Sequence, residues 1–244
     1  MPVEAIRTVN LTKRYKDITA VDQLNLQIRE GELFCLLGVN GAGKTTTIKM
    51  LSCLTAPTEG DAFLFGKSIR RETAGVKSII AVSPQETAVA PGLTVKENLE
   101  LMCGIHGISK DRCQARIAEL TGLLGLAPVL PRKAGKLSGG WQRRLSIAMA
   151  LVSKPAILFL DEPTLGLDVL ARRELWDLIW ALKGEVTMVL TTHYMEEAEA
   201  LADRIGIMKD GRLLRCDTVA AMKQAACADT VEQAFIRIVK GEVQ

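Results

Sequence analysis

A glycine-rich stretch places the strongest constraint on what this chain can fold into. Residues 38–45 read GVNGAGKT, which fits the spacing G-x-x-x-x-G-K-[ST] of a phosphate-binding loop, or P-loop. The apolar run 33–37, LFCLL, is typical of a buried parallel strand, and residues 46–54 after the loop are expected to form a helix. Strand, loop and helix therefore occur in the order that the motif requires. Backbone N–H groups of the loop and the helix N-terminus would then hold a phosphate.

Two side chains of this loop have predicted roles of their own. Lys44 is expected to reach the β- and γ-phosphates of a nucleotide, and the Thr45 hydroxyl is expected to bind Mg²⁺. The alternative is a glycine turn that carries Lys-Thr by chance. The strand and the helix on either side argue against that alternative.

The composition is that of an ordinary globular protein. The 244 residues are 48% hydrophobic, and 31 basic against 28 acidic residues leave a net charge of +3, which gives no indication of nucleic-acid binding. The first residues contain no long apolar run and no segment approaches about 18 apolar residues, so neither a signal peptide nor a transmembrane helix is expected. The six cysteines form no C-x-x-C pair and are expected to be reduced thiols of a cytosolic protein. Zinc binding is not expected, because the only histidines, His106 and His193, are not at ligand spacing.

Hydrophobic patterning divides the chain into an α/β core and an inserted helical region. Besides the run before the P-loop, strands are predicted at 3–15, 21–28, 61–65, 77–82, 156–160, 186–191, 205–208 and 212–215. From residue 94 to 153 no strand pattern occurs, and Thr94 and Glu97 fit a capping box at the start of a helix. Further helices are predicted at 111–124, 138–152, 170–183, 195–202 and 231–239. We therefore predict an α/β core made of residues 1–89 and 153–215, a helical subdomain at 90–152, and a short helical tail at 216–244. The core is expected to be mainly a parallel sheet with antiparallel N-terminal strands.

An acidic pair follows the predicted buried strand 156–160. Asp161 stands where a P-loop ATPase holds Mg²⁺, and Glu162 could polarise an attacking water as a general base. The alternative is a helix N-cap or a surface acidic pair. The P-loop in the same chain favours the catalytic interpretation.

A second predicted anion site lies at 137–140, LSGG, before the helix that ends near Val152. A serine and two glycines at a helix start offer free N–H groups and the helix dipole to an anion. The alternative is a simple serine N-cap. Two phosphate cradles in one chain are hard to explain with one nucleotide, so the second is expected to complete the site of another copy.

Taken together, the motifs of this chain resemble those of the nucleotide-binding subunit of ABC transporters, over nearly its whole length. GVNGAGKT resembles the Walker A motif of that family, ILFLDEP the Walker B motif with its following glutamate, and LSGG the family signature. VSPQE resembles the Q-loop, LGLD the D-loop, and TTHYMEEAE the H-loop. The resemblance implies a P-loop NTPase fold, ATP and Mg²⁺ as cofactors, and ATP hydrolysis.

The resemblance also implies roles for single residues. Gln85 would contact Mg²⁺ and water, and its loop would couple to a membrane partner. His193 would contact the γ-phosphate, Asp168 would meet the P-loop region of the opposite subunit, and Tyr15 would stack on adenine, although a strand-edge tyrosine is the alternative. The predicted catalytic residues are Glu162, His193 and Gln85, and the predicted Mg²⁺ ligands are Thr45, Gln85 and Asp161. The predicted ATP-binding residues are Tyr15, Gly38, Asn40, Gly41, Ala42, Gly43, Lys44, Thr45, Thr46, Ser138, Gly139, Gly140 and Asp168.

One position departs from the family pattern. Trp141 follows LSGG where the family usually has glutamine, and Gln142 comes next. An indole has one donor and no acceptor, so it cannot replace the glutamine amide. Binding through Ser138 and Gly140 is left in place, while the role of the fifth position is open.

The resemblance also bears on the type of ABC protein. The chain is expected to drive a separate membrane permease from the inner face of the cell membrane, paired head to tail with a second copy or a homologous subunit around two ATP. The segments LTVKENL at 93–99 and VEQAFI at 231–236 favour the exporter-type (ABC-2) ATPases of drug, antibiotic and sodium efflux. Two alternatives are a soluble ABC ATPase that acts on ribosomes or DNA, and a binding module that does not hydrolyse ATP. The sequence carries no indication of the transported cargo.

Overall fold

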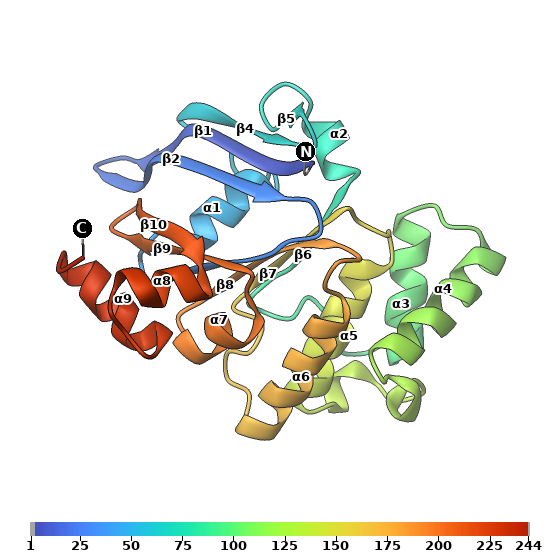
Figure 1. Ribbon diagram of the computed structural model, residues 1–244. Coiled ribbons are helices and arrows are strands. Elements are labelled where there is room, and N and C mark those ends of the chain that lie inside the picture. The colour runs from blue at the N-terminus through green and yellow to red at the C-terminus, as the bar shows by residue number, and fades with distance from the viewer. Residues whose placement is uncertain (1–2, 244) are drawn as a thin grey trace.

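Two β-sheets with helix α1 between them form the upper and central part of the molecule (Figure 1). The computed structural model describes residues 3–243. The strands are β1 (Glu4–Tyr15), β2 (Ile18–Arg29), β3 (Leu33–Gly38), β4 (Glu59–Leu64), β5 (Lys67–Ser68), β6 (Ile80–Ser83), β7 (Ile157–Asp161), β8 (Thr187–Thr192), β9 (Arg204–Lys209) and β10 (Arg212–Thr218). The α-helices are α1 (Lys44–Leu51), α2 (Thr73–Lys77), α3 (Val95–Ile105), α4 (Lys110–Leu123), α5 (Gly139–Leu151), α6 (Val169–Ala181), α7 (Met195–Leu201), α8 (Val219–Ala225) and α9 (Val231–Lys240).

The larger sheet carries the P-loop strand. Its order is β10-β9-β3-β8-β7-β6, and all neighbouring pairs are parallel except β9 with β10. The smaller sheet, in the order β2-β1-β4-β5, is antiparallel throughout. The prediction of a mainly parallel sheet with antiparallel N-terminal strands is confirmed. In a parallel sheet all carboxyl ends lie at one edge, so the loops after β3, β6, β7 and β8 meet there.

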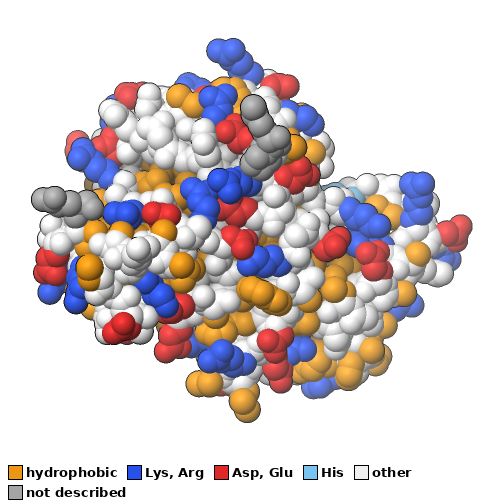
Figure 2. All heavy atoms as spheres, in the orientation of Figure 1, with side chains coloured by type: hydrophobic (Ala, Val, Ile, Leu, Met, Phe, Trp, Pro, Cys, Tyr) orange, Lys and Arg blue, Asp and Glu red, His pale blue; other side chains and the backbone are white. Residues whose placement is uncertain are grey.

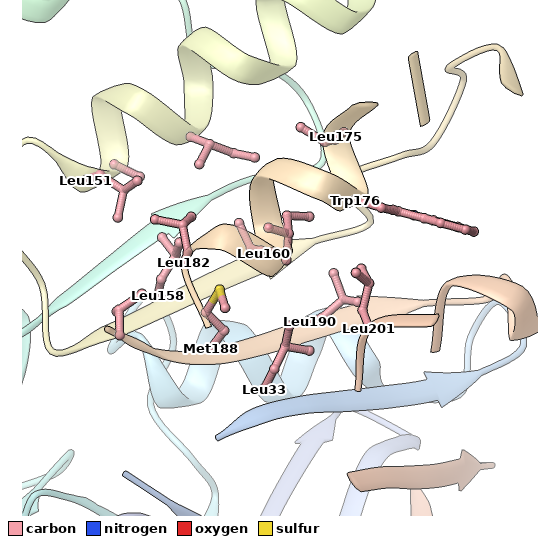
Figure 3. Close-up of a cluster of buried hydrophobic side chains, with 14 of the residues drawn as sticks. Leu33, Leu151, Leu158, Leu160, Leu175, Trp176, Leu182, Met188, Leu190 and Leu201 are labelled. Atoms are coloured by element: carbon pink, nitrogen blue, oxygen red, sulfur yellow. The ribbon is translucent and has the colours of Figure 1, made fainter. Parts of the chain in front are cut away.

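Strand β3 is apolar at every position before its final glycine because both of its faces are buried. Leu33, Cys35 and Leu37 belong to a cluster with the helices α3 to α7, whereas Phe34 and Leu36 belong to a second cluster with α1 and the small sheet. Side chains alternate between faces along a strand, so a strand covered on both sides reads as a continuous apolar run. Figure 3 shows the first cluster, where leucines of β3, β7 and β8 point towards the helices.

Helices α3, α4 and α5 lie between β6 and β7 in the sequence and to one side of the large sheet (Figure 1). The predicted capping box is confirmed: Thr94 Oγ1 accepts a hydrogen bond from the N–H of Glu97, and the Glu97 carboxylate accepts one from the N–H of Thr94. The division into a core, a subdomain at 90–152 and a tail stays a prediction.

Several expected boundaries in the first half of the chain are wrong: the helix expected to end at residue 54 ends at Leu51, and the strands expected from residues 21 and 61 begin at Ile18 and Glu59. The helix after the P-loop begins at Lys44 and not at residue 46, because the loop itself supplies the first helical turn. The strand expected at 77–82 begins only at Ile80, since Lys77 is the last residue of the short helix α2. Helix α2 has a single buried residue, Val76, and therefore no apolar periodicity that would predict it.

In the second half of the chain, the last strand is longer than expected. β10 continues to Thr218, beyond the predicted end at Arg215, because it pairs with β9 as far as Arg204. The helices at 170–183 and 195–202 are present as α6 and α7, with ends that differ by one or two residues.

No helix within residues 3–243 is long and apolar enough to cross a membrane. On the face shown in Figure 2, basic and acidic side chains are interspersed.

Candidate functional site

The P-loop lies where β3 ends and α1 begins. Gly41 has φ +83° and Gly43, the N-cap of α1, has φ +103°, both in the left-handed region that favours glycine. A Cβ on Gly43 would lie 2.4 Å from the carbonyl oxygen of Ala20 in β2. Any side chain there would strain the backbone and push the small sheet away. The glycine is therefore required both by conformation and by the close approach of β2.

A cavity of about 580 Å³ lies beside this loop. It is lined by Tyr15, Ala20, Asn40, Gly41, Ala42, Gly43, Lys44, Thr45, Thr46, Gln85, Glu162, Leu165 and His193. The loops that follow β3, β6, β7 and β8 thus contribute to one cavity, together with the end of β1. Ala20 and Leu165 line it without having been predicted. The predicted residues that do not line it are Gly38, Ser138, Gly139, Gly140, Asp161 and Asp168.

A buried ion pair lies at the floor of this cavity. Lys44 Nζ is 3.2 Å from Glu162 Oε1, and their side chains are 6% and 7% exposed. The ammonium group also donates to the carbonyl oxygens of Gly38 at 2.7 Å and Val39 at 3.3 Å. The other carboxylate oxygen of Glu162 lies 2.7 Å from His193 Nδ1. Glu162 is therefore held between a cation that can reach phosphate and a ring that can orient it.

A hydroxyl and a carboxylate lie side by side beneath the loop. Thr45 Oγ1 donates to Asp161 Oδ1 at 3.1 Å, and Thr191 Oγ1 donates to the same oxygen at 2.5 Å. Thr191 also binds the backbone of Glu162. The Glu162 nitrogen donates to the carbonyl oxygen and to the Oγ1 of Thr191, each at 3.1 Å. Glu162 has φ +48°, an uncommon backbone conformation for a side chain of this size, and the Thr191 contacts fix it there.

Thr191 is a site residue that sequence reasoning missed. It is fully buried near the end of β8, where two consecutive threonines interrupt an apolar strand just before His193. Buried hydroxyl groups need hydrogen-bond partners, so a threonine pair at a strand end beside a predicted catalytic histidine could have indicated this residue.

The signature turn lies outside the cavity. Ser138 is the exposed N-cap of α5, and its side chain makes no capping hydrogen bond. A Cβ on Gly139 would contact Leu167 at 3.6 Å, and one on Gly140 would lie 3.1 Å from the Ala171 side chain. The turn therefore packs against the start of α6, and none of its three residues lines the cavity of its own chain.

The remaining predicted residues are all exposed. Asp168 accepts a hydrogen bond from the N–H of Ala171 at 2.9 Å and caps α6. Gln85 lines the cavity from the irregular segment after β6. Tyr15 is 46% exposed at the end of β1, with Lys13 Nζ 4.9 Å from the centre of its ring. An exposed aromatic side chain that lines the cavity is what base stacking requires.

Comparison with known proteins identifies the family. The family model described as "ABC transporter" matches residues 21–165. The daunorubicin/doxorubicin resistance ATP-binding protein DrrA of Streptomyces peucetius is 42% identical over 225 residues, which cover 92% of this chain and 68% of that protein. This chain belongs to the ABC transporter family. A human relative, the phospholipid-transporting ATPase ABCA3, is 39% identical over 226 residues, but these are 91% of this chain and only 13% of that protein.

Solved structures of ATP-binding cassettes have the same fold as this ABC ATPase. An ATP-binding subunit of an ABC transporter has a TM-score of 0.85 at 24% identity and covers 96% of this chain and 99% of its own. A dimeric cassette in a post-hydrolysis state, bound to ADP and Pi, has a TM-score of 0.77 at 30% identity and covers 87% of this chain and 98% of its own. The expected P-loop NTPase fold and the assignment as an ATPase are confirmed.

Proposed function

We propose that this ABC ATPase hydrolyses ATP between two copies arranged head to tail, and that it powers a separate membrane permease of an exporter. The main support for the ATPase mechanism is the position of Glu162, which contacts both Lys44 and His193 beside the cavity. Support for the paired arrangement comes from the signature turn, which is exposed and lies outside the cavity of its own chain. A dimeric cassette among the structural relatives supports the pairing of two copies.

In this proposal ATP binds with its phosphates on the P-loop. The N–H groups of 40–46 and the N-terminus of α1 surround the phosphate oxygens. The Lys44 ammonium group exchanges its contacts with the carbonyl oxygens of Gly38 and Val39 for the β- and γ-phosphates. Tyr15 stacks on the adenine ring at the cavity rim.

Hydrolysis then uses the second half of the site. Glu162 takes a proton from the attacking water, whose oxygen forms the new bond to the γ-phosphorus as the bond to ADP breaks. His193 orients the carboxylate, and contacts the γ-phosphate. Ser138, Gly139 and Gly140 of the second copy close over the nucleotide, and Asp168 faces the P-loop region of that copy. These roles are proposals for the residues predicted from the sequence.

The residues beneath the loop fit Mg²⁺. The adjoining oxygens of Thr45 and Asp161 form a hard donor set of the kind that Mg²⁺ takes, with the rest of its shell from water and phosphate. Thr45, Asp161 and Gln85 would hold the ion. When bound, Mg²⁺ neutralises charge that develops on the transferred phosphoryl group.

The export assignment rests on the relatives. DrrA of Streptomyces peucetius is named as a drug-resistance ATP-binding protein, which supports an exporter over a soluble ATPase acting on ribosomes or DNA. The permease would be a separate chain, and this subunit would then work at the inner face of the cell membrane.

Replacement of the proposed base tests this function. We expect Glu162→Gln to lower kcat for ATP hydrolysis by at least about a hundredfold, because general-base catalysis contributes roughly 10²–10⁴-fold. ATP binding should persist, and the variant should accumulate as an ATP-bound dimer in size-exclusion chromatography. Glu196→Gln, an exposed glutamate on α7, is the matched control and should hydrolyse ATP normally. Turnover of Glu162→Gln within threefold of the wild type would contradict the role of Glu162.

A further inference from the structure

An arginine on α5 has an unusual environment that the mechanism above does not use. The Arg143 side chain is buried, with 4% of the residue exposed. Its guanidinium group donates two hydrogen bonds, from Nη1 to the carbonyl oxygen of Pro84 and from Nη2 to that of Gln85, both at 2.6 Å. Two consecutive carbonyl oxygens are thus held by the two arms of one planar group, and this geometry suits arginine and not lysine.

The burial of this charge is costly, and no ion pair within residues 3–243 relieves it. Burial lowers the pKa of Arg143, while the charges of Asp161 and Glu197 oppose this shift. Nε has no hydrogen-bond partner among the described residues. A charged group is rarely buried without a specific reason, so the two carbonyl contacts are the natural explanation for its position.

These contacts join two parts of the site that are far apart in sequence. Residues 84–93 have no regular secondary structure, and within them Gln85 lines the ATP cavity. Arg143 lies one turn after the start of α5, which carries the signature turn at its N-terminus. A second contact supports the same junction, because the buried hydroxyls of Ser83 and Ser146 lie 3.0 Å apart. Helix α5 and strand β6 are in contact there (Figure 1).

We propose that Arg143 is a positioning residue for ATP hydrolysis, which fixes the backbone of Gln85 relative to α5 and so sets the place of the Gln85 side chain in the cavity. The same contacts keep the signature turn at a defined distance from Gln85, so that a displacement of either is passed to the other. This inference rests on the proposed role of Gln85.

A double-mutant cycle separates positioning from a general structural role. We expect Arg143→Gln to lower kcat about tenfold with little change in KM for ATP, because small misplacements of a site group reduce rates by about this much or more. In a Gln85→Ala background, Arg143→Gln should lower kcat less than threefold, since the side chain through which it acts is gone. Arg143→Lys, which keeps the charge but can satisfy only part of the contacts, should fall between Arg143→Gln and the wild type. Equal losses in the two backgrounds, or an Arg143→Gln kcat within threefold of the wild type, would overturn the proposal.

The matched control is another arginine that binds a backbone carbonyl within the helical region. Arg116 on α4 donates to the carbonyl oxygen of Leu151 and pairs with Glu119, and among the described residues it forms no hydrogen bond or ion pair with 84–93. Arg116→Gln is expected to leave kcat unchanged and to add no coupling to Gln85→Ala. If Arg143→Gln does not fold, the same cycle with Arg143→Lys tests the coupling between Arg143 and Gln85.

A second measurement needs no catalytic turnover. Hydrogen–deuterium exchange of the backbone amides in 84–93 should be faster in Arg143→Gln than in the wild type or Arg116→Gln, while exchange in the P-loop strand β3 stays the same. Unchanged exchange in 84–93 would contradict the proposal. A wild-type protein without ATP hydrolysis would contradict the proposed function instead, and the exchange measurement would still test Arg143.

Discussion

One buried glutamate, four residues after His193 in the sequence, lies outside the proposed mechanism. Glu197 on α7 is fully buried, and its Oε1 accepts a hydrogen bond from Trp176 Nε1 at 3.1 Å. Its Oε2 has no hydrogen-bond partner among the described residues. Burial raises the pKa of Glu197 above its usual value, and the charge of Glu162 adds to the rise, whereas the hydroxyls of Thr192 and Thr164 and the indole of Trp176 oppose it. Burial outweighs these contacts, so the ionised carboxylate is disfavoured at this depth.

Removal of this charge should stabilise the protein at neutral and alkaline pH. A carboxyl group with a raised folded-state pKa stabilises the fold below its unfolded pKa of about 4.5, and this contribution is lost as the pH rises through the folded-state pKa. Glu197→Gln keeps an acceptor for Trp176 and should raise the free energy of unfolding by about 1–2 kcal/mol at pH 8. The gain should shrink as the pH falls towards 4.5. Urea unfolding of both proteins from pH 8 to pH 5 measures this, with the exposed Glu196→Gln as control. If the stability gain of Glu197→Gln grows as the pH falls, the prediction is wrong.

At the scale of one element, the start of helix α3 is stabilised by a capping box in its first turn. The helix follows the irregular segment that contains Gln85, and its capping box satisfies two backbone N–H groups through the Thr94 and Glu97 side chains. The backbone N–H of Thr94 is the main cause that lowers the pKa of Glu97, and the Thr94 hydroxyl adds to it. The cap therefore works best when Glu97 is ionised.

Loss of this cap should destabilise the helical region. Thr94→Ala is expected to lower the free energy of unfolding by about 1 kcal/mol, because it leaves an N-terminal N–H group without a partner. Thr94→Ser keeps the hydroxyl and should stay close to the wild type. A lowered carboxyl pKa stabilises the fold above the unfolded pKa and loses that effect as the pH falls, so the wild-type advantage should diminish below about pH 4.5. Chemical denaturation at pH 7 and pH 4 makes the comparison, and equal stability of the Ala and Ser variants would contradict the role of the cap.

On the scale of the whole molecule, the P-loop cavity and the signature turn are separate surfaces of one chain. The cavity is formed by loops at the carboxyl edge of the large sheet, whereas the turn lies at the start of α5 against α6. One chain alone therefore does not bring the predicted ATP-binding residues into one site. In the proposed head-to-tail pair, each site takes its P-loop from one copy and its signature turn from the other.

Mixing two inactive variants tests this arrangement. Ser138→Arg and Lys44→Ala should each abolish hydrolysis, but in a mixed dimer one site carries both lesions and the other carries neither. We expect the mixture to recover part of the wild-type ATPase activity, up to about one intact site per mixed dimer. As a control, the double variant mixed with wild type leaves one lesion in each site of the mixed dimer. If the mixed dimers form but stay inactive, the shared site is contradicted. It is also contradicted if the control mixture is more active than the wild-type homodimers that it contains.

Much of the fold could be predicted because its signals are local. The run LFCLL shows a strand buried on both faces, the glycines at 41 and 43 show a backbone that needs positive φ, and Thr94 with Glu97 shows a helix start. Where the local signal is weak, the prediction failed, as at the short helix α2 with its single buried residue. Four of the family motifs stand directly after β3, β6, β7 and β8, and these loops meet at the carboxyl edge of the sheet because the strands are parallel.

Other features depend on contacts that no local pattern contains. Thr191 joins Asp161 and Glu162 only because β7 and β8 are neighbours in the sheet. The two carbonyl bonds of Arg143 exist only because α5 packs beside β6, and the sequence alone shows this residue as one of two adjacent arginines on a helix. The sequence by itself thus determined most of the elements, the P-loop and the family, because these follow from periodicity, glycine positions and motif spacing. The tertiary structure decided which polar side chains are buried together, because burial and pairing arise only when segments distant in the chain are packed against each other.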